Sequence, residues 1–195
     1  MRAVRWRALG AALSLVCSSA PMSAQQLQIE TTEHDEAVLV NATATMQVRP
    51  ATAWNVISDY DHLAEFVPGM HSSRVLRRNG NQVLVEQKGS LGFLFFQQAI
   101  EIRLAVIEWP QQRIVARAVG GNLQQMDGSY TLETLDDGRV RLSYSGRLVP
   151  AFTIPAMLGK PVVRQLLTRQ FKALVDEILR REALSLGSGN PSSNN

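Results

Sequence analysis

The chain has 195 residues, of which 45% are hydrophobic and 19% charged, so it is long enough for one domain with a packed core. It carries 20 basic and 17 acidic residues, but Arg2, Arg5 and Arg7 fall within the first seven positions, and the charges of the remainder balance. The basic excess is therefore no indication of a nucleic-acid partner. Cys17 is the only cysteine, so the chain after residue 24 excludes disulfides, thiolate metal sites and a cysteine nucleophile.

The first 24 residues have the pattern of a secretory signal peptide. The three arginines precede an apolar run from Ala8 to Cys17, and small residues lead from there to Ala24. The run is too short to span a bilayer. We expect cleavage after Ala24, with Ala20 as the alternative, and a periplasmic or secreted mature protein. Retention by an N-terminal anchor, including a lipoprotein attachment at Cys17, is the competing interpretation.

The next segments predict a strand followed by two short helices. Residues 25–36 are polar and indicate a loose lead-in. Between Val38 and Val48 apolar and polar residues alternate, which is typical of a half-buried strand. Pro50 suits the first turn of a short helix. Asp59 or Asp61 is expected to cap a second one, which stops before Pro68.

The middle of the chain predicts six more strands joined by short turns. We place the strands at residues 73–77, 82–88, 95–109, 113–119, 125–135 and 139–148. The connections at 79–81, 110–112 and 136–138 contain Asn, Gly, Pro and Asp, which favour tight turns. Strands joined by such short connections must be antiparallel neighbours, because a parallel crossover needs a dozen or more residues.

The end of the chain predicts a long amphipathic helix from Pro161 to Leu184. Its apolar residues recur every three or four positions and form one stripe: Val163, Leu166, Leu167, Phe171, Leu174, Val175 and Ile178. Residues 185–195 are rich in Ser, Gly and Asn and are expected to be disordered.

These elements together predict an α+β fold over residues 37–184. A curved antiparallel sheet would grip the long C-terminal helix, so that the concave apolar face and the helix stripe bury each other. The two short helices after the first strand would then sit where the first two strands part, at the mouth of the grip.

Several segments of the chain resemble one known family. They are the run Trp54–Gly69, the segment Ser73–Leu76, the segment Gly128–Glu133, Tyr144 with Pro150, and Ala173-Leu174 in the final helix. In these segments the chain is similar to the polyketide cyclase/dehydrase and coenzyme-Q-binding START-like family. The resemblance implies the helix-grip fold and an apolar ligand held between sheet and helix. The superfamily includes lipid and quinone carriers as well as polyketide cyclases, so it indicates the fold more sharply than the function.

A group of ionisable residues near the second short helix has two interpretations. Asp59, Asp61, His62, Glu65 and His71 could form a metal or acid–base cluster. We favour the alternative, in which the aspartates cap helices and His62 and Glu65 form a solvated helix face. The sequence has no Ser–His–Asp order, phosphate-binding glycine loop or zinc spacing. We therefore predict no catalytic residue, no metal and no cofactor.

The longest predicted strand has one apolar and one charged face. Glu101 and Arg103 are assigned outward, because charges without partners are rarely buried. The inward face then consists of Phe96, Gln98, Ile100, Ile102, Leu104 and Val106. Gln98 would hydrogen-bond either a ligand or a neighbouring backbone group.

Aromatic and sulfur-containing side chains either fill the core or line a pocket. The apolar stretch 152–158 is either a flap over that pocket, a surface that touches a membrane, or a buried connection. The candidate ligand-binding residues are Phe66, Phe96, Gln98, Ile100, Met126, Tyr130, Tyr144, Phe152, Met157, Leu166, Leu167 and Phe171.

The sequence favours an exported carrier of a hydrophobic small molecule: a lipid, an isoprenoid quinone or a polycyclic compound. Its partners would be that ligand and, transiently, a membrane, but no nucleic acid. The alternatives are a polyketide cyclase/dehydratase-like enzyme and an envelope protein-interaction module. A buried His, Asp or Glu in the cavity would favour the enzyme, and a filled cavity would favour the interaction module.

Overall fold

The computed structural model describes residues 26–34, 37–93, 96–151 and 159–187. In chain order its elements are β1 (Gln26–His34), β2 (Ala37–Met46), α1 (Pro50–Ile57), the 3₁₀ helix η1 (Tyr60–Glu65), β3 (Met70–Asn79), β4 (Gln82–Phe93), β5 (Phe96–Trp109), β6 (Arg113–Gly121), β7 (Leu123–Thr134), β8 (Val140–Pro150) and α2 (Gly159–Gly187). From β2 onward the predicted order of elements is confirmed, and Pro50 begins α1 as expected.

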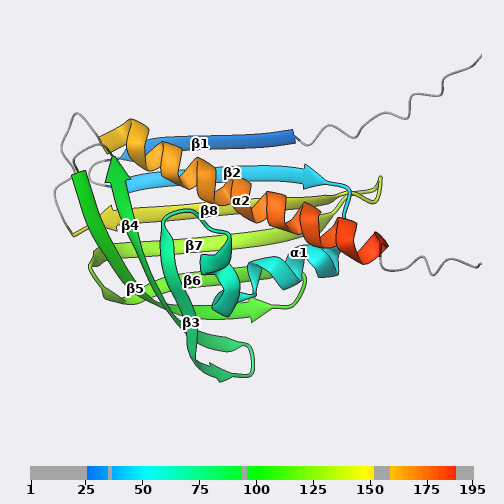
Figure 1. Ribbon diagram of the computed structural model, residues 1–195, viewed down its shortest axis with the longest axis horizontal. Coiled ribbons are helices and arrows are strands. Elements are labelled where there is room, and N and C mark those ends of the chain that lie inside the picture. Colours follow the sequence, from blue (N-terminus) through cyan, green and yellow to red (C-terminus); the bar gives the residue numbers. More distant parts are fainter. Residues whose placement is uncertain (1–25, 35–36, 94–95, 152–158, 188–195) are drawn as a thin grey trace, which may run out of the picture.

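All eight of these strands form one antiparallel sheet in the order β1-β2-β8-β7-β6-β5-β4-β3. From β3 to β8 each strand pairs with the next through a short connection, and β8 returns to lie beside β2. The segment with α1 and η1 carries the chain from β2 to β3 at the far edge, passing over the concave face (Figure 1).

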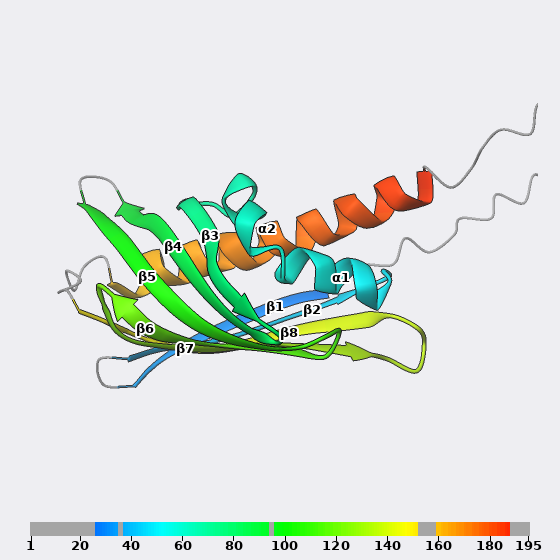
Figure 2. The same ribbon diagram turned by 90° about the horizontal axis from the view of Figure 1, so that it is seen from below.

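The sheet curves around α2, and α1, η1 and α2 lie on its concave face (Figure 2). Val140 and Leu142 of β8 and Val175 and Ile178 of α2 are completely buried and form the centre of the core. This arrangement confirms the predicted helix grip. The helix grip forms because every second residue of a strand faces inward, and these apolar residues and the apolar stripe of α2 bury each other. None of the helices in the described ranges combines the length and apolar character that a membrane crossing requires.

The two faces of β5 are assigned as predicted. Ile102, Leu104 and Val106 are buried, whereas Glu101 and Arg103 are exposed. Glu101 forms an ion pair with Lys88 of β4 at 3.3 Å, so the outward charges are paired across strands.

The lead-in predicted at residues 25–36 is wrong for its described part, because residues 26–34 form β1. This strand pairs with β2 along its whole length, and Leu27 and Ile29 pack against the core. It resembles a polar loop in sequence because it is an edge strand, whose solvent face and free edge favour polar residues.

The predicted caps of η1 are also wrong. Neither aspartate side chain caps the helix. Asp61 accepts a hydrogen bond from the backbone N–H of Val75 at 2.7 Å, and the Asp59 carboxylate binds the side chains of His62 and Arg181. The C-terminal helix extends to Gly187, so residues 185–187 are not part of a disordered tail. Ser185 donates to the carbonyl of Glu182 at 2.7 Å and accepts from Arg49, which holds the last turn against the start of α1.

Candidate functional site

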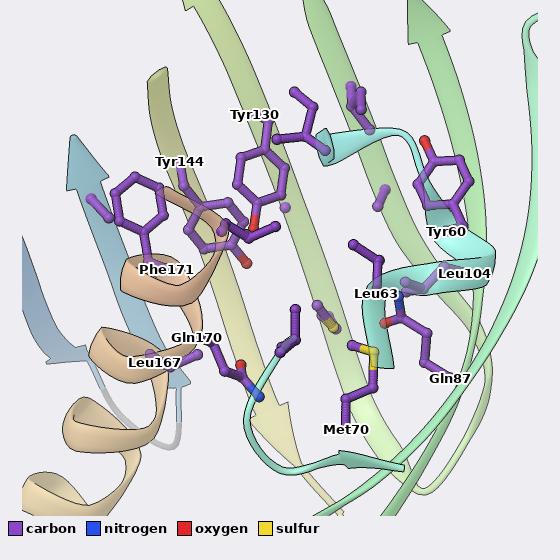
Figure 3. A pocket seen from close by; sticks show the side chains of 18 of the residues that line it. Tyr60, Leu63, Met70, Gln87, Leu104, Tyr130, Tyr144, Leu167, Gln170 and Phe171 are labelled. Carbon is purple, nitrogen blue, oxygen red and sulfur yellow. The ribbon is translucent and has the colours of Figure 1, made fainter. Parts of the chain in front are cut away.

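A cavity of about 170 Å³ lies between the concave face of the sheet, η1 and the first half of α2 (Figure 3). Its apolar walls come from β2, β3, β5, β6 and β7 and from the helices α1, η1 and α2. They consist of Val40, Ala42, Ile57, Leu63, Val67, Met70, Leu104, Val106, Ile114, Ala116, Met126, Leu167, Phe171 and Leu174. The deep wall of Leu104, Val106 and Ile114 is buried, whereas Met70 and Leu167 are only half-buried and lie toward the rim.

Two tyrosines form the polar part of the cavity floor. Tyr130 of β7 and Tyr144 of β8 are cross-strand partners, and their ring centroids are 4.7 Å apart with a tilt of 40°. Figure 3 shows both hydroxyls directed toward the interior of the cavity. Each points the same way because both residues occupy inward positions of neighbouring strands.

Glycines beneath Tyr144 make room for its ring. Gly146 and Gly128 are paired across β8 and β7 and also lie on the concave face. A Cβ atom at Gly146 would come within 2.4 Å of the Tyr144 hydroxyl oxygen, and one at Gly128 within 3.0 Å. The ring therefore lies flat along the strands, which leaves the space above it empty.

Both tyrosines are neutral hydrogen-bond donors at physiological pH. Burial raises the pKa of Tyr144 to about 12. Burial, with a smaller contribution from Tyr144, also raises the pKa of Tyr130. Neither hydroxyl forms a hydrogen bond within the described parts of the chain. Among the described residues the fully buried hydroxyl without a partner is that of Tyr60 of η1, which also lines the cavity. A ligand oxygen that accepts from Tyr130 or Tyr144 would gain a hydrogen bond worth about 1 kcal/mol.

Two glutamines also contribute to the polar lining. Gln87 of β4 donates weakly to the hydroxyl of Ser73 at 3.4 Å, and Gln170 of α2 donates to the carbonyl of Pro68 at 3.1 Å. The second bond joins α2 to the segment after η1 across the exposed rim. None of the described residues that line the cavity is charged. The site can therefore hold an apolar molecule with neutral oxygen-containing groups, but it offers no counter-ion.

Ion pairs hold η1 against α2 next to the cavity. Asp59 accepts from His62 at 2.6 Å and from Arg181 at 2.8 Å, and Arg181 also donates to Glu177 at 2.7 Å. Burial opposes ionisation of Asp59, but the bonds from His62 and Arg181 lower its pKa overall. The bond from Arg180, with a further one from Arg181, lowers the pKa of Glu177 to about 2.

These ion pairs form a clamp between η1 and α2. No group of three or more metal-ligating side chains occurs within the described ranges. His71, another member of the group singled out from the sequence, lies apart and contacts the Ser90 hydroxyl at 3.2 Å. The ionisable residues around η1 therefore stabilise one wall of the cavity without entering it.

The structure brings together five of the candidate ligand-binding residues. Those in the lining are Met126, Tyr130, Tyr144, Leu167 and Phe171. Four others do not line the cavity. Phe66 lies under the guanidinium of Arg181 at 5.8 Å, and Leu166 packs against Gly69. Ile100 is half-buried near the start of β5, and Gln98 donates to the carbonyl of Ala99 at 2.9 Å, the backbone alternative. Phe96 begins β5, and Phe152 and Met157 lie outside the described residues.

The sequence reasoning missed both glutamines and, in the predicted second short helix, the cavity-lining residues Tyr60 and Leu63. Gln87 has the same parity as the buried Val83 and Val85, and Gln170 lies between Leu167 and Phe171 on the helix stripe. Both positions carried a usable signal, namely a polar residue on an otherwise apolar face. Tyr60 and Leu63 of η1 carried no such signal, because nothing local shows that this short helix folds over the sheet.

Comparisons with known proteins agree with this geometry. The family model described as polyketide cyclase/dehydrase and lipid transport matches residues 46–175. The Zhui aromatase/cyclase of Streptomyces sp. R1128 superposes with a TM-score of 0.65 at 15% identity, covering 80% of this chain and 99% of its own. A START superfamily protein of Mycobacterium smegmatis gives 0.58 at 14% identity, covering 75% and 97%. A STAR-related lipid transfer protein of Xanthomonas axonopodis gives 0.56 at 13% identity, covering 78% and 98%. No curated protein matches the sequence. At these identities the structural matches establish the fold alone.

Proposed function

Because this chain belongs to the polyketide cyclase/dehydrase and lipid transport family, we propose that it binds a neutral hydrophobic small molecule in the cavity between the sheet and α2. The observation that carries the proposal is the uncharged apolar lining with two unpaired tyrosine hydroxyls. The ligand is a ring or chain with one or two acceptor oxygens, as in an isoprenoid quinone, a lipid or a polycyclic ketone. The proposed contacts include Tyr130, Tyr144, Leu167 and Phe171.

The cavity volume limits what is held inside. A volume of about 170 Å³ is close to that of an engineered apolar cavity of about 150 Å³, in another protein, that binds benzene. One ring that buries about 150 Å² gains about 4 kcal/mol, which corresponds to a dissociation constant near 1 mM. Tighter binding requires that the rest of the ligand pass the rim at Gln170 and Met70 and cover further apolar surface. The hydrogen bond from Gln170 to Pro68 would then open on entry.

Binding is favoured over acid–base catalysis by the protonation state of the site. A general base needs a pKa near the working pH, whereas both tyrosines are held well above it. A cyclase-like activity is the second candidate, favoured by the same Tyr130–Tyr144 pair, which can donate hydrogen bonds to a substrate carbonyl. Such an activity would rely on shaping the bound chain rather than on proton abstraction.

The basic and apolar segment at the N-terminus supports export, so we place the carrier in the periplasm or outside the cell. There it would meet hydrophobic compounds of the envelope, with transient contact to a membrane during loading. The ligand-binding function itself does not depend on this location.

Two dyes with the same aromatic skeleton test the ligand class. N-phenyl-1-naphthylamine is neutral, and 1-anilinonaphthalene-8-sulfonate carries a sulfonate. We expect saturable binding of the neutral dye and at least about tenfold weaker binding of the sulfonate, because the lining has no cation to compensate its charge. Equal affinity for both dyes, or no saturable binding of the neutral one, would contradict the proposal. Mass spectrometry of organic extracts of the purified protein should then identify the natural ligand.

A further inference from the structure

The outer face of the sheet, opposite the helices, carries an apolar patch bordered by arginines. The residue register places its members side by side on β3 to β8. We name it the outer arginine patch; it consists of Leu84, Ala105, Ile107, Trp109 and Val115, with Arg77, Arg113, Arg117 and Arg147 around them.

The apolar part of this patch is unusually open to solvent. Ile107 is 38% exposed and Trp109 is 42% exposed, although both are large apolar side chains on a regular strand. Ala105 and Ile107 separate two shallow hollows, one bordered by Arg77 and the other by Arg113, Arg117 and Arg147. An exposed apolar surface with a polar rim is typical of an interaction site.

The charges of the patch are not balanced, unlike those elsewhere on the same face. Arg141 pairs with Glu133 at 2.8 Å, and Arg74 pairs with Glu86 at 2.6 Å. Within the patch the one carboxylate is Asp127, which binds Arg117 at 2.7 Å.

Arg77 and Arg113 form no ion pair or hydrogen bond through their side chains with any part of the chain that the structure describes, so they are free to bind carboxylates of another molecule. Arg147 lies opposite Asp127 across β7 and β8, and its charge helps to lower the pKa of that carboxylate, so a single carboxylate serves both Arg117 and Arg147.

We propose that the outer arginine patch is a docking surface for an acidic protein partner. Its basic residues are all arginines, which form bidentate bonds with carboxylates, and arginine and tryptophan are the residues most enriched at the centres of protein interfaces. Docking here also leaves the opposite face free, so the cavity under α2 and η1 stays accessible while the partner is bound (Figure 2). A flat membrane fits this convex face less well.

The test uses polypeptide probes and charge-matched variants of the mature protein. The probes are poly-L-glutamate and a soluble random copolymer of glutamate and tyrosine, measured at 150 mM salt, an ionic strength near the physiological value of about 0.15 M. The test variant is R113E/R147E. The control is R139E/R141E, which changes the net charge by the same amount. Its arginines lie just before β8 and within it, and each already has a carboxylate partner.

We expect R113E/R147E to bind the copolymer at least about tenfold more weakly than the wild type, and R139E/R141E to change little. Trp109→Ser should weaken copolymer binding but not poly-L-glutamate binding, because only the copolymer offers apolar contacts. Equal losses in both charge variants would show general electrostatics and overturn the proposal, as would no copolymer binding by the wild type. Binding to vesicles of anionic phospholipid that R113E/R147E abolishes, without copolymer binding, would assign the patch to a membrane instead.

Discussion

Replacing Gly146 with alanine tests whether the flat position of Tyr144 creates the ligand space. The new Cβ would lie 2.4 Å from the Tyr144 hydroxyl oxygen and 2.7 Å from its Cζ atom. Ordinary contacts between such atoms are about 3.5 Å, so the ring must move by about 1 Å. The strand backbone lies on one side of the ring and the cavity on the other, so the ring moves into the cavity.

This movement should reduce affinity more than stability. Losing one hydrogen bond costs about 1 kcal/mol, and the lost space adds a similar amount, which together correspond to roughly tenfold weaker binding or more. Overpacking a filled core costs about 1–3 kcal/mol, but here the empty volume accepts the ring, so we expect less than about 1 kcal/mol of destabilisation. Titration with N-phenyl-1-naphthylamine and thermal melting, on the same preparation, measure the two effects.

Two variants serve as controls for this prediction. Gly128→Ala brings its Cβ only to 3.0 Å from the Tyr144 hydroxyl, so its effect on binding should be smaller than that of Gly146→Ala. Ser145→Ala changes the neighbouring residue on the outer face and should leave dye binding unchanged. If Gly146→Ala binds the dye as well as the wild type, or melts far lower without any loss of affinity, the cavity is not the binding site.

Three further predictions concern the helix, the clamp and the N-terminus. Leu167→Trp, at the half-buried rim, should weaken dye binding about tenfold with little change in melting temperature. His62→Ala and Glu65→Ala, on the solvent side, should leave dye binding unchanged. The opposite pattern would contradict the carrier function. The pKa of Glu177 falls from its ordinary value of 4.5 to about 2 on folding, so its contribution to stability is present above pH 4.5 and is lost as the pH falls toward 2. Acid titration of Glu177→Gln should therefore show a smaller loss of stability over this interval than the wild type, and identical curves would refute the role of the ion pair. Intact mass of protein from the periplasmic fraction should correspond to a chain that starts near Gln25, and a full-length cytosolic protein would contradict export.

Local patterns in the sequence were sufficient to predict most of the fold. The alternation along β5 and the three-to-four spacing along α2 reflect burial of one face, which the sequence records residue by residue. The turns at Asn79–Asn81 and Asp136–Gly138 are too short for a parallel crossover, so the strands that they join must be antiparallel neighbours. The strand order from β3 to β8 could therefore be predicted without knowledge of tertiary contacts. Edge strand β1 was not predicted because, among those of its residues whose burial the structure describes, only Leu27 and Ile29 pack against the core.

The site required the tertiary structure, because its members are distant in sequence and their roles depend on depth. The sequence by itself placed Tyr130 and Tyr144 among the residues that fill the core or line a pocket, and it placed Leu167 on the apolar stripe of the helix. It could not show that Phe66 packs under Arg181, or that Gln87 and Gln170 reach the cavity. The alternation along a strand or the stripe of a helix shows which face a side chain is on, but not whether that part of the face lines the cavity. Likewise, the aspartates of η1 were assigned as caps because capping is a local interaction. Only the packing of η1 against α2 brings Arg181 within 2.8 Å of Asp59 and turns a local pattern into a long-range clamp.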